Sequence, residues 1–373
     1  MECNVCKKGE ETGEFVFQGQ DKIIENVSVD VKTNTPKIEE IASNINNFGY
    51  QDIQDDDLYS EAKVKLLVSK HNLDIDKEAI EAKNSVEEHL KKFGAEISDA
   101  DSSEIDQILD KVNPLAKEVN LPKEMINGRL TDKAKDIFYI PLVKLPNGEM
   151  YEGFWNRDGK KHGYGIKVND DGTVYKGFWN NDVEEDFGVF VGKNNDYYIG
   201  ELINGKQEGN GKLVEKGKFE YEGQFKDGKQ NGNGTLKNLV ENYIYVGDMV
   251  DLKKEGKGNL RMNDGTSYSG EFENDLFSGN GKLIFPNGNS YEGTFKNGKM
   301  DGSGTFKWAD GRVYEGEYKD GLRSGKGKMN WNENQYYEGE WLNDQQHGEG
   351  RYFIDGKETS GKFRFGKIIN AAK

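Results

Sequence analysis

The stretch GRVYEGEYKDGLRSGKGKM, residues 311–329, decides how the second part of this chain folds. It holds five glycines, interleaved with tyrosines and charged residues. A second copy, GNSYEGTFKNGKMDGSGTF, occupies residues 288–306, which places it 23 residues upstream. Similarity at a fixed distance of this size indicates a repeat architecture, in which each copy forms one structural unit.

The unit begins with the pattern Tyr-x-Gly, which occurs nine times at spacings of 23 or 24 residues. The nine tyrosines are Tyr151, Tyr175, Tyr198, Tyr221, Tyr245, Tyr268, Tyr291, Tyr314 and Tyr337. Eight units continue with a Gly-x-Gly step, whereas the unit at Tyr175 keeps only Gly188. A worn tenth copy, TSGKF, ends at Phe363. Nine copies in phase indicate an array.

Strand geometry explains why these residue types recur. Residues two apart in an extended chain share a face, so Tyr314, Gly316 and Tyr318 are expected to point one way, and Glu315 and Glu317 the other. A glycine leaves bare backbone on which a neighbouring ring can lie. The Asp-Gly and Asn-Gly steps between the strands favour tight hairpin turns that need positive φ. Each unit is therefore predicted to be a β-hairpin.

A lone hairpin is marginal in water, so the units are expected to stack. We predict a mainly β repeat array, an elongated single-layer antiparallel sheet, with an N-terminal α-helical region. The stretch IFYIPLVKLPNG, residues 137–148, matches the second half of a unit and is expected to close the first edge as a half hairpin. The structural repeat residues are predicted to include Tyr151, Gly153, Tyr221, Gly223, Tyr268, Gly270, Tyr291, Gly293, Tyr314, Gly316, Tyr337 and Gly339.

Composition excludes several classes of protein. Only 34% of the 373 residues are hydrophobic, which is thin for two compact cores. No apolar run approaches the roughly 18 residues of a membrane span, and the first residues lack the apolar stretch of a signal peptide. The two cysteines agree with a reducing compartment. The net charge is −16, of which −12 falls on residues 1–136. We expect a soluble, intracellular protein.

Three regions follow from these patterns. Residues 1–35 lack a period and are expected to form a flexible tail, with residues 26–33 as a candidate strand. Residues 36–136 are predicted to be an acidic helical region, a small bundle whose apolar stripes pack on one another or on a partner. Residues 137–373 form the array of about nine repeats with partial end units. The expected helices are Pro36–Phe48, Asp57 to about Lys70, Asp76–Phe93 and Ser103–Val112.

The repeat YEGxFxxGKxxGxGxxxxxDGxxY resembles the MORN repeat (membrane occupation and recognition nexus), most closely at residues 291–307 and 314–328. The resemblance implies an elongated hairpin array of the kind found in cytoskeletal, ciliary and junctional scaffolds. Histone methyltransferases and phosphoinositide kinases also carry such repeats, but their catalytic domain follows the array. Here only about ten residues follow Phe363, so neither enzymatic version is expected. Helices before a long array resemble radial spoke head proteins of the axoneme and MORN scaffolds of protist cytoskeletons.

Two motifs that suggest metal binding have simpler explanations. Cys3 and Cys6 have the spacing of half a zinc site, but a tetrahedral site needs four ligands. The runs that begin at Asp74 and Asp99 start like calcium-binding loops, yet both lack glycine at position 6 and glutamate at position 12. Helix caps explain these aspartates better. We predict no metal-binding residue.

Two further motifs suggest chemistry without supporting it. The Gly-x-Gly steps recur in a β pattern, whereas a dinucleotide-binding loop occurs once, between a strand and a helix. His162 and His347 occupy a repeat position that other units fill with Asn, Glu, Ser or Asp, which is typical of a turn or rim. We therefore predict no catalytic residue, no cofactor and no enzymatic activity.

Two classes of function remain open. Lysines on the charged face would bind anionic lipid such as phosphoinositides at about 1 kcal/mol each, but residues 137–373 carry a net charge of −4. The same charge disfavours nucleic acid. The other class is a scaffold, because an aromatic face is too apolar to stay bare unless curvature or a partner covers it. We expect a non-enzymatic scaffold of the cytoplasm and cytoskeleton, as in a ciliary radial spoke head. Its expected partners are axonemal or cytoskeletal proteins and, through sheet edges, other copies.

Overall fold

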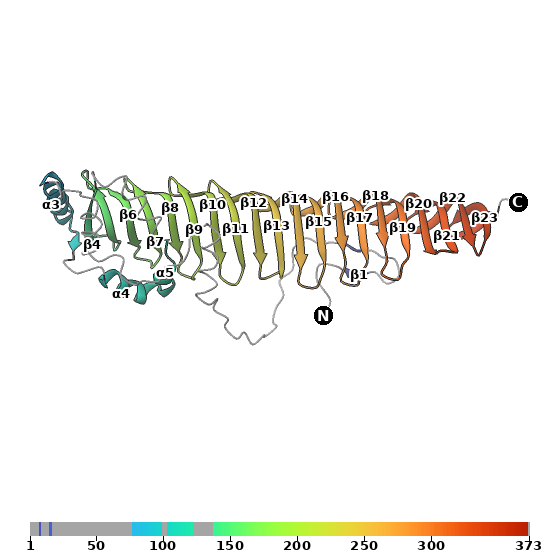
Figure 1. Ribbon diagram of the computed structural model, residues 1–373, viewed down its shortest axis with the longest axis horizontal. Helices are drawn as coiled ribbons and strands as arrows, with labels where there is room; N and C mark the ends of the chain where they lie inside the picture. The colour runs from blue at the N-terminus through green and yellow to red at the C-terminus, as the bar shows by residue number, and fades with distance from the viewer. Residues whose placement is uncertain (1–6, 9–14, 17–76, 99–102, 122–136, 372–373) are drawn as a thin grey trace. The chain divides into compact units, whose positions relative to one another are not determined.

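The computed structural model describes residues 7–8, 15–16, 77–98, 103–121 and 137–371. Its main feature is an open antiparallel sheet of 22 strands, β3 to β24, which follow one another in sequence order (Figure 1). The sheet is open because β3 pairs only with β4, and β24 only with β23, among the described strands. The chain divides into two compact units, Val27–Lys229 and Gln230–Lys373, the second together with Met1–Asn26.

The first unit contains the helices and the first strands of the array. Its helices are α3 (Lys77–Lys92), α4 (Ser103–Val112) and α5 (Pro114–Glu118). Its strands are β3 (Glu96–Ile97), β4 (Ile137–Lys144), β5 (Met150–Asn156), β6 (Lys161–Val168), β7 (Val174–Asn180), β8 (Val183–Val191), β9 (Tyr197–Ile203), β10 (Lys206–Glu215) and β11 (Phe219–Lys226).

The second unit continues the array with hairpins alone. Its strands are β12 (Lys229–Asn238), β13 (Tyr243–Val250), β14 (Lys253–Met262), β15 (Ser267–Glu273), β16 (Leu276–Ile284), β17 (Ser290–Lys296), β18 (Lys299–Lys307), β19 (Val313–Lys319), β20 (Leu322–Asn332), β21 (Gln335–Leu342), β22 (Gln345–Ile354), β23 (Lys357–Arg364) and β24 (Lys367–Ala371). Near the start of the chain, β1 (Lys7–Lys8) pairs with β2 (Phe15–Val16).

The predicted tight turns are confirmed. Asp320 and Gly321, which join β19 to β20, have φ values of 51° and 92°. Two residues with positive φ are what a type I′ hairpin turn requires. Not every turn uses glycine, because Leu252 occupies the second turn position between β13 and β14 with φ of 72°. That position carries backbone strain that the Asp-Gly turns avoid.

The two glycines of each Gly-x-Gly step have different structural roles. In the unit at Tyr291, the first glycine, Gly302, has φ of 91° and lies where the register between β17 and β18 shifts, in a β-bulge. The second, Gly304, has no positive φ, but a Cβ there would overlap the ring of Tyr291. The sequence predicted the ring contact and did not anticipate the bulge.

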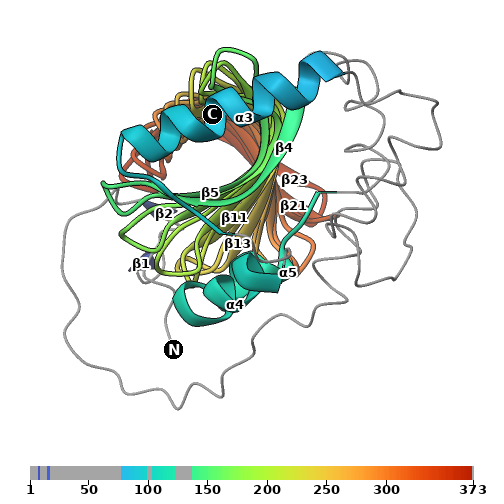
Figure 2. The same ribbon diagram turned by 90° about the vertical axis from the view of Figure 1, so that its left-hand side faces the viewer.

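The helices predicted at Asp76–Phe93 and Ser103–Val112 are confirmed as α3 and α4. In Figure 2, α3 crosses the end of the sheet beside β4, and α4 and α5 lie along one side of the strands. The buried core joins α4 and α5 to the sheet, so the expected helical bundle is wrong for these helices. Because the first repeats offer an apolar face, the helices bury more apolar surface on the sheet than on each other.

The predicted half hairpin at the first edge is confirmed in part. β4 pairs with β5 as the second strand of a unit does. The edge itself is β3, because Glu96 and Ile97 pair with Lys144 and Val143 on the other side of β4. The remaining predictions for the N-terminal third lie outside the described residues. They concern Cys3, Cys6, the tail of residues 1–35 with its candidate strand, and the helices Pro36–Phe48 and Asp57–Lys70.

Candidate interaction surfaces

We call the face of the sheet that carries the repeat tyrosines the tyrosine face. All nine tyrosines, Tyr151 to Tyr337, are at most 2% exposed. Tyr291 lies over the glycine two residues on, Gly293, and over Gly304, which pairs with it across the hairpin, and seven other repeat tyrosines make the same contacts. Each hydroxyl donates a hydrogen bond to the carbonyl three residues on, for example from Tyr291 to Thr294 at 3.0 Å.

Rings from neighbouring units interlock on this face. Tyr291 packs edge to face against Phe295 of its own strand, with centroids 5.1 Å apart, and against Tyr318 of the next unit at 5.2 Å. Tyr314 repeats the arrangement with Tyr318 and Trp341. Edge-to-face packing adds about 0.5–1.5 kcal/mol per pair to simple area burial. The rings thus cover one another, and the tyrosine face needs no partner to bury its tyrosines.

The predicted structural repeat residues all lie in this arrangement. In each of these six units the tyrosine is buried, and the glycine two residues on pairs across the strands with the second glycine of a Gly-x-Gly step; the residues are Tyr151, Gly153, Tyr221, Gly223, Tyr268, Gly270, Tyr291, Gly293, Tyr314, Gly316, Tyr337 and Gly339. Burial raises the pKa of Tyr221 and of Tyr337 to about 12. These side chains support the fold and present no free reactive group.

We call the other side of the sheet the opposite face, and it differs between the two units. In Val27–Lys229 it is apolar, and α4 and α5 cover it. Leu109 of α4 and Ala116 of α5 are fully buried there. They pack in a cluster with strand residues that alternate with the tyrosine face, including Ile166, Val174, Phe178, Val189 and Ile199.

Polar contacts fix these helices in register on the sheet. Lys176 of β7 is only 2% exposed and donates a hydrogen bond of 2.8 Å to the side chain of Asn120. Burial lowers the pKa of Lys176 to about 8, against the opposing effect of Asp106. At the start of α4, Glu104 forms an ion pair of 2.9 Å with Lys144. Carboxylates of α4 therefore face lysines of the strands.

Between α4 and α5, Asn113 ties the helical segment to two hairpin turns. Its side-chain nitrogen donates a hydrogen bond of 3.0 Å to the carbonyl of Gly192 and lies 3.5 Å from that of Gly172. The residue is 3% exposed, so these bonds are made inside the interface. One side chain thereby joins the turn before β7 to the turn before β9.

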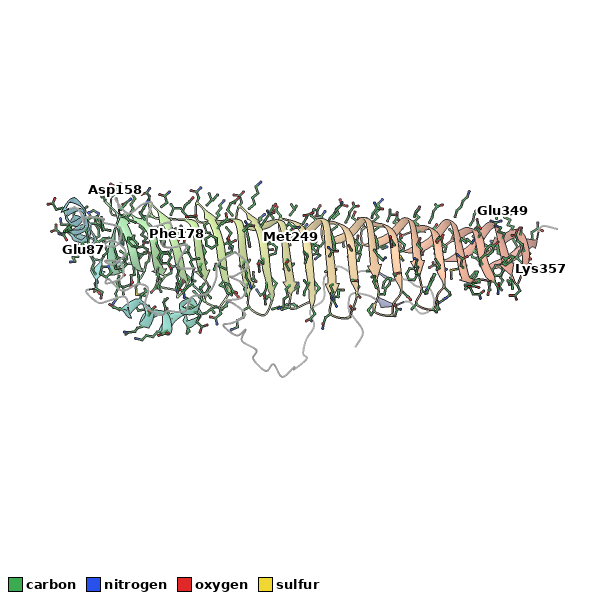
Figure 3. All side chains as sticks on the ribbon, in the orientation of Figure 1. Glu87, Asp158, Phe178, Met249, Glu349 and Lys357 are labelled. Carbon is green, nitrogen blue, oxygen red and sulfur yellow. The ribbon has the colours of Figure 1, made fainter. Side chains whose placement is uncertain are left out.

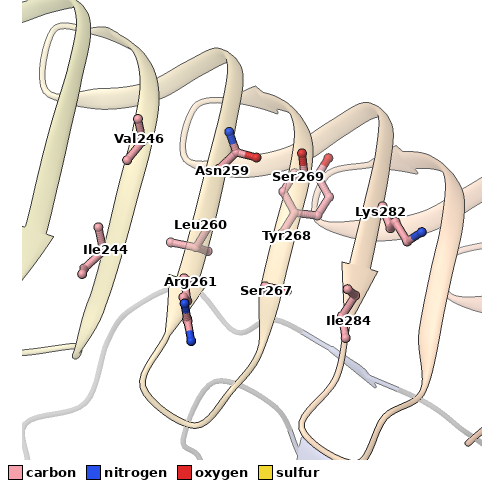
Figure 4. A pocket seen from close by; sticks show the side chains of 10 residues that line it. All are labelled: Ile244, Val246, Asn259, Leu260, Arg261, Ser267, Tyr268, Ser269, Lys282 and Ile284. Carbon is pink, nitrogen blue, oxygen red and sulfur yellow. The ribbon is translucent and has the colours of Figure 1, made fainter.

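In Gln230–Lys373 the opposite face is mostly polar and carries an apolar groove. Ile244, Val246 and Ile284 line this groove and are 45%, 43% and 40% exposed. The groove has a volume of about 360 Å³, and the short side chains of Ser267 and Ser269 lie between the aliphatic ones (Figure 4). Figure 3 shows side chains along the strands, with Met249 within this part of the sheet. At corresponding positions in later units stand charged residues such as Glu292 and Glu315.

Basic residues near the hairpin turns are paired with acidic residues of the following unit. The separations are 3.5 Å for Lys206 and Asp227, 3.0 Å for Lys254 and Asp275, 3.6 Å for Lys299 and Asp320, and 2.8 Å for Arg323 and Asp344. These four pairs each join one repeat unit to the next. They also neutralise the lysines and arginines that would otherwise present a basic rim to an anionic surface.

The motifs that suggested chemistry lie in ordinary structure. The two calcium-like runs continue into α3 and α4. His347 lies on β22 directly before Gly348, which has a positive φ. Its ring centroid is 6.0 Å from that of Phe365. Among the described residues, no group of His, Cys, Asp and Glu side chains could hold a metal ion. No helix in the described part of the chain is long and apolar enough to cross a membrane.

The sequence prediction missed both apolar areas of the opposite face. It treated that face as uniformly charged because the units at Tyr291 and Tyr314 are. The missing signal was present at the positions directly before and after the repeat tyrosine. Val174 and Lys176 flank Tyr175, and Ile244 and Val246 flank Tyr245, where a regular unit such as that at Tyr291 has Ser and Glu.

Comparison with known proteins identifies the repeat. The MORN repeat family matches seven segments, residues 151–174, 198–214, 221–237, 268–290, 291–311, 314–335 and 337–358. The units at Tyr175 and Tyr245 are not among them, although both form hairpins like the others. No curated protein matches the chain in sequence.

Similarity to solved structures is slight. The TCP domain of Drosophila melanogaster SAS-4, solved with a proline-rich motif of Ana2, is 13% identical, with a TM-score of 0.26 over 40% of this chain and 81% of that one. The TCP10c domain of Drosophila melanogaster Sas-4 is 14% identical, with a TM-score of 0.16 over 52% and 92%. A streptogramin B lyase is 13% identical, with a TM-score of 0.12 over 61% and 69%. The matched segments and the hairpin geometry together show that the chain is a MORN repeat protein with seven MORN repeats.

Proposed function

We propose that this protein is a non-enzymatic scaffold whose hairpin array binds other proteins. The observation that carries the proposal is the apolar groove of Ile244, Val246 and Ile284 on a face that is otherwise polar. Exposed aliphatic side chains gathered between polar ones are characteristic of protein interaction surfaces. The tyrosine face does not serve this purpose, because its tyrosines are buried by the chain itself.

The location that we propose is the ciliary axoneme, in an assembly of the radial spoke head type. The support is the resemblance stated above, in which a helical region precedes a long MORN array. A cytoskeletal position at a basal body or the cell cortex is the alternative. Imaging of a tagged full-length protein in a ciliated cell tests this. Signal along the axoneme is expected, and signal confined to the basal body or to the membrane would contradict it.

A membrane-associated scaffold that binds phosphoinositides is the second candidate. The structure offers little basis for it, because Lys299 lies 3.6 Å from Asp320 and similar pairs recur along the array. Surface attraction of the remaining lysines would be screened at about 0.15 M salt, where the Debye length is about 8 Å. We therefore expect no stable binding to anionic vesicles at physiological ionic strength.

Co-sedimentation of the full-length protein with phosphoinositide vesicles at about 0.15 M salt separates the two candidates. The protein is expected to stay in the supernatant. The matched control variant reverses the charge of Lys296, Lys299 and Lys319. Sedimentation of the wild-type chain that this variant abolishes would favour the membrane-associated function over the protein scaffold.

A further inference from the structure

The groove lies on the opposite face of β13–β16. Two of its residues occupy the same positions in the repeat as residues that α4 and α5 cover. Ile244 stands directly before its repeat tyrosine, as Val174 does, and Val246 directly after it, as Ile199 does. Val174 and Ile199 are 1% and 5% exposed because they lie in the cluster beneath α4 and α5. Equivalent strand positions are thus buried under α4 and α5 in Val27–Lys229 and exposed in Gln230–Lys373.

Charge around the groove matches the same arrangement. Arg261 pairs across the strands with Ile244 and with Ser267, and Lys282 pairs with Ser269, so both cations line the groove. Lys237 and Lys307 continue the same row of the opposite face on β12 and β18. Glu292 lies 3.1 Å from Lys282, and Asp248 and Glu271 follow two residues after Val246 and Ser269 on the same face. Arg261 therefore lies within the groove, in the row between Ile244 and Ile284, and Lys282 lies at its β16 side.

The part of the opposite face under α4 and α5 shows what kind of segment binds such a surface. α4 is an amphipathic helix that buries Ile105 and Leu109, and its carboxylates face strand lysines, Glu104 toward Lys144 and Asp106 toward Lys176. Apolar contact with flanking opposite charge is how an amphipathic helix recognises a groove. The open groove presents the sheet half of that interface.

The repeat family match points to the same two places. The units it passes over are those at Tyr175 and Tyr245. The first supplies Lys176 and Phe178 to the surface beneath α4 and α5, and the second supplies Ile244 and Val246 to the groove. Both units keep the buried tyrosine and depart from the pattern where side chains enter the opposite face. Both departures thus lie at apolar parts of the opposite face, to which matched units also contribute, with Ile166 and Ile199 beneath the helices and Ile284 in the groove.

From these observations we infer that the groove binds an acidic amphipathic helix of a partner protein, with aliphatic residues at helical spacing and Asp or Glu beside them. This inference rests on the proposed scaffold function and names the class of partner. The partner helix would pack its aliphatic side chains against Ile244 and Val246 on one side and Ile284 on the other, and direct its carboxylates toward Arg261 and Lys282.

The test uses the full-length protein and a labelled peptide with the sequence of residues 103–119, which is an acidic amphipathic segment of the required class. Fluorescence anisotropy should show saturable binding with a Kd of roughly 10–100 µM, as expected for the small area that a short helix buries. Val246→Asp and Ile284→Asp should each weaken binding at least tenfold. Val250→Asp is the matched control, because Val250 is an exposed aliphatic residue of the same strand and face outside the groove, and should leave the Kd unchanged.

The charge part of the inference has its own variants. The double change Arg261→Glu and Lys282→Glu should weaken the acidic peptide at least tenfold. A second peptide carries lysine in place of Asp106 and Asp110. Its affinity for the wild-type protein should be no higher than the affinity of the acidic peptide for the double variant. Equal affinity of both peptides for the wild-type protein would show that charge does not select the ligand and would overturn the inference.

Three further outcomes would also overturn it. Undiminished binding in Val246→Asp and Ile284→Asp would place the peptide elsewhere, for instance by exchange with α4. Binding that appears only after Ile41→Asp and Ile45→Asp would assign the groove to the chain's own residues 36–48. A dimer in sedimentation that Ile284→Asp abolishes would assign it to a second copy. The vesicle and localisation experiments do not depend on any of these results, so failure of the groove and failure of the scaffold function remain distinguishable.

Discussion

On the tyrosine face, unit after unit presents the same groups: a buried ring, a glycine on each strand beneath it and a hydroxyl bonded to the carbonyl three residues on. On the opposite face of the same strands, the side chains are aliphatic under α4 and α5, aliphatic again in the groove, and charged in later units. Because alternate residues of a strand point to opposite sides, one face can be held constant while the other varies. Repetition specifies the fold, and departures from it specify surfaces.

High pH should remove the whole contribution of the tyrosine face. An unperturbed tyrosine loses its proton near pH 10, whereas burial raises the pKa of Tyr221 and of Tyr337 to about 12. Between these values the unfolded chain binds fewer protons than the folded chain, so stability is complete below pH 10 and falls as pH rises toward 12. With nine buried tyrosines, unfolding is expected in this range.

Circular dichroism and tyrosinate absorbance, followed together from pH 9 to 12.5, check the expectation. The two signals should change in one cooperative step, since ionisation requires the rings to leave the glycines. Tyrosinate absorbance that grows near pH 10 while the β signal persists would show that the rings ionise in the folded state.

A side chain at a glycine beneath a ring should have the largest effect of any single substitution. A Cβ at Gly316 would lie 2.5 Å from the Cα of Gly327 and the same distance from the hydroxyl of Tyr314. Gly316→Val is therefore expected to destabilise the protein by about 3 kcal/mol, beyond the roughly 0.5–1 kcal/mol of a backbone-entropy change and in the opposite sense. Glu315→Gln, one residue away on the other face, is the control and should change stability by less than about 0.5 kcal/mol. Equal melting temperatures for Gly316→Val and wild type would contradict the packing of rings on glycine.

The same truncation on the covered and open parts of the opposite face should differ severalfold in effect. Leu109 of α4 is fully buried against the sheet, so Leu109→Ala should cost about 2–4 kcal/mol and expose the amides of α4 to hydrogen exchange. Ile284 is 40% exposed in the groove, so Ile284→Ala should cost less than about 1 kcal/mol in the absence of a partner. A comparable loss in the two variants would show that the groove is occupied within the chain.

Turn chemistry offers a smaller effect that works in both directions. Leu252 has φ of 72° and is 55% exposed, a conformation that costs a non-glycine residue about 1–2 kcal/mol. Leu252→Gly should therefore stabilise the protein by about 1 kcal/mol. Gly321 occupies the equivalent turn position with φ of 92°, and an added Cβ there would meet no atom within 4 Å. Gly321→Leu should therefore lower the free energy of unfolding by about the same amount, through turn strain alone. Urea denaturation measures both. Changes of the same sign would exclude turn strain as the cause.

The sequence was sufficient to predict what the period encodes. Tyr-x-Gly alternation, the Asp-Gly turns and the helices at Asp76–Phe93 and Ser103–Val112 are local patterns, and the structure contains all of them. The packing of α4 on the sheet could not be derived, because an apolar helical stripe does not state what it will cover. The pairing of Glu96 and Ile97 with β4 could not be derived either, because no sequence pattern relates these two segments. The groove went unnoticed because Ile244 and Val246 depart from the repeat, and a consensus averaged over the units removes such departures.

The nearest-neighbour character of the array has a mechanical consequence. In Gln230–Lys373 the ring contacts, the turn ion pairs and the strand ladders each join a unit to itself or to the next one. A force applied to the edge strand β24 would therefore be resisted by one hairpin at a time, and the unit would peel in small successive steps. In Val27–Lys229 the helical segment crosses several strands, and Asn113 alone bonds to two separate turns. Those strands would share the load and yield together, so the two parts of one sheet would differ in toughness although their hairpins are alike.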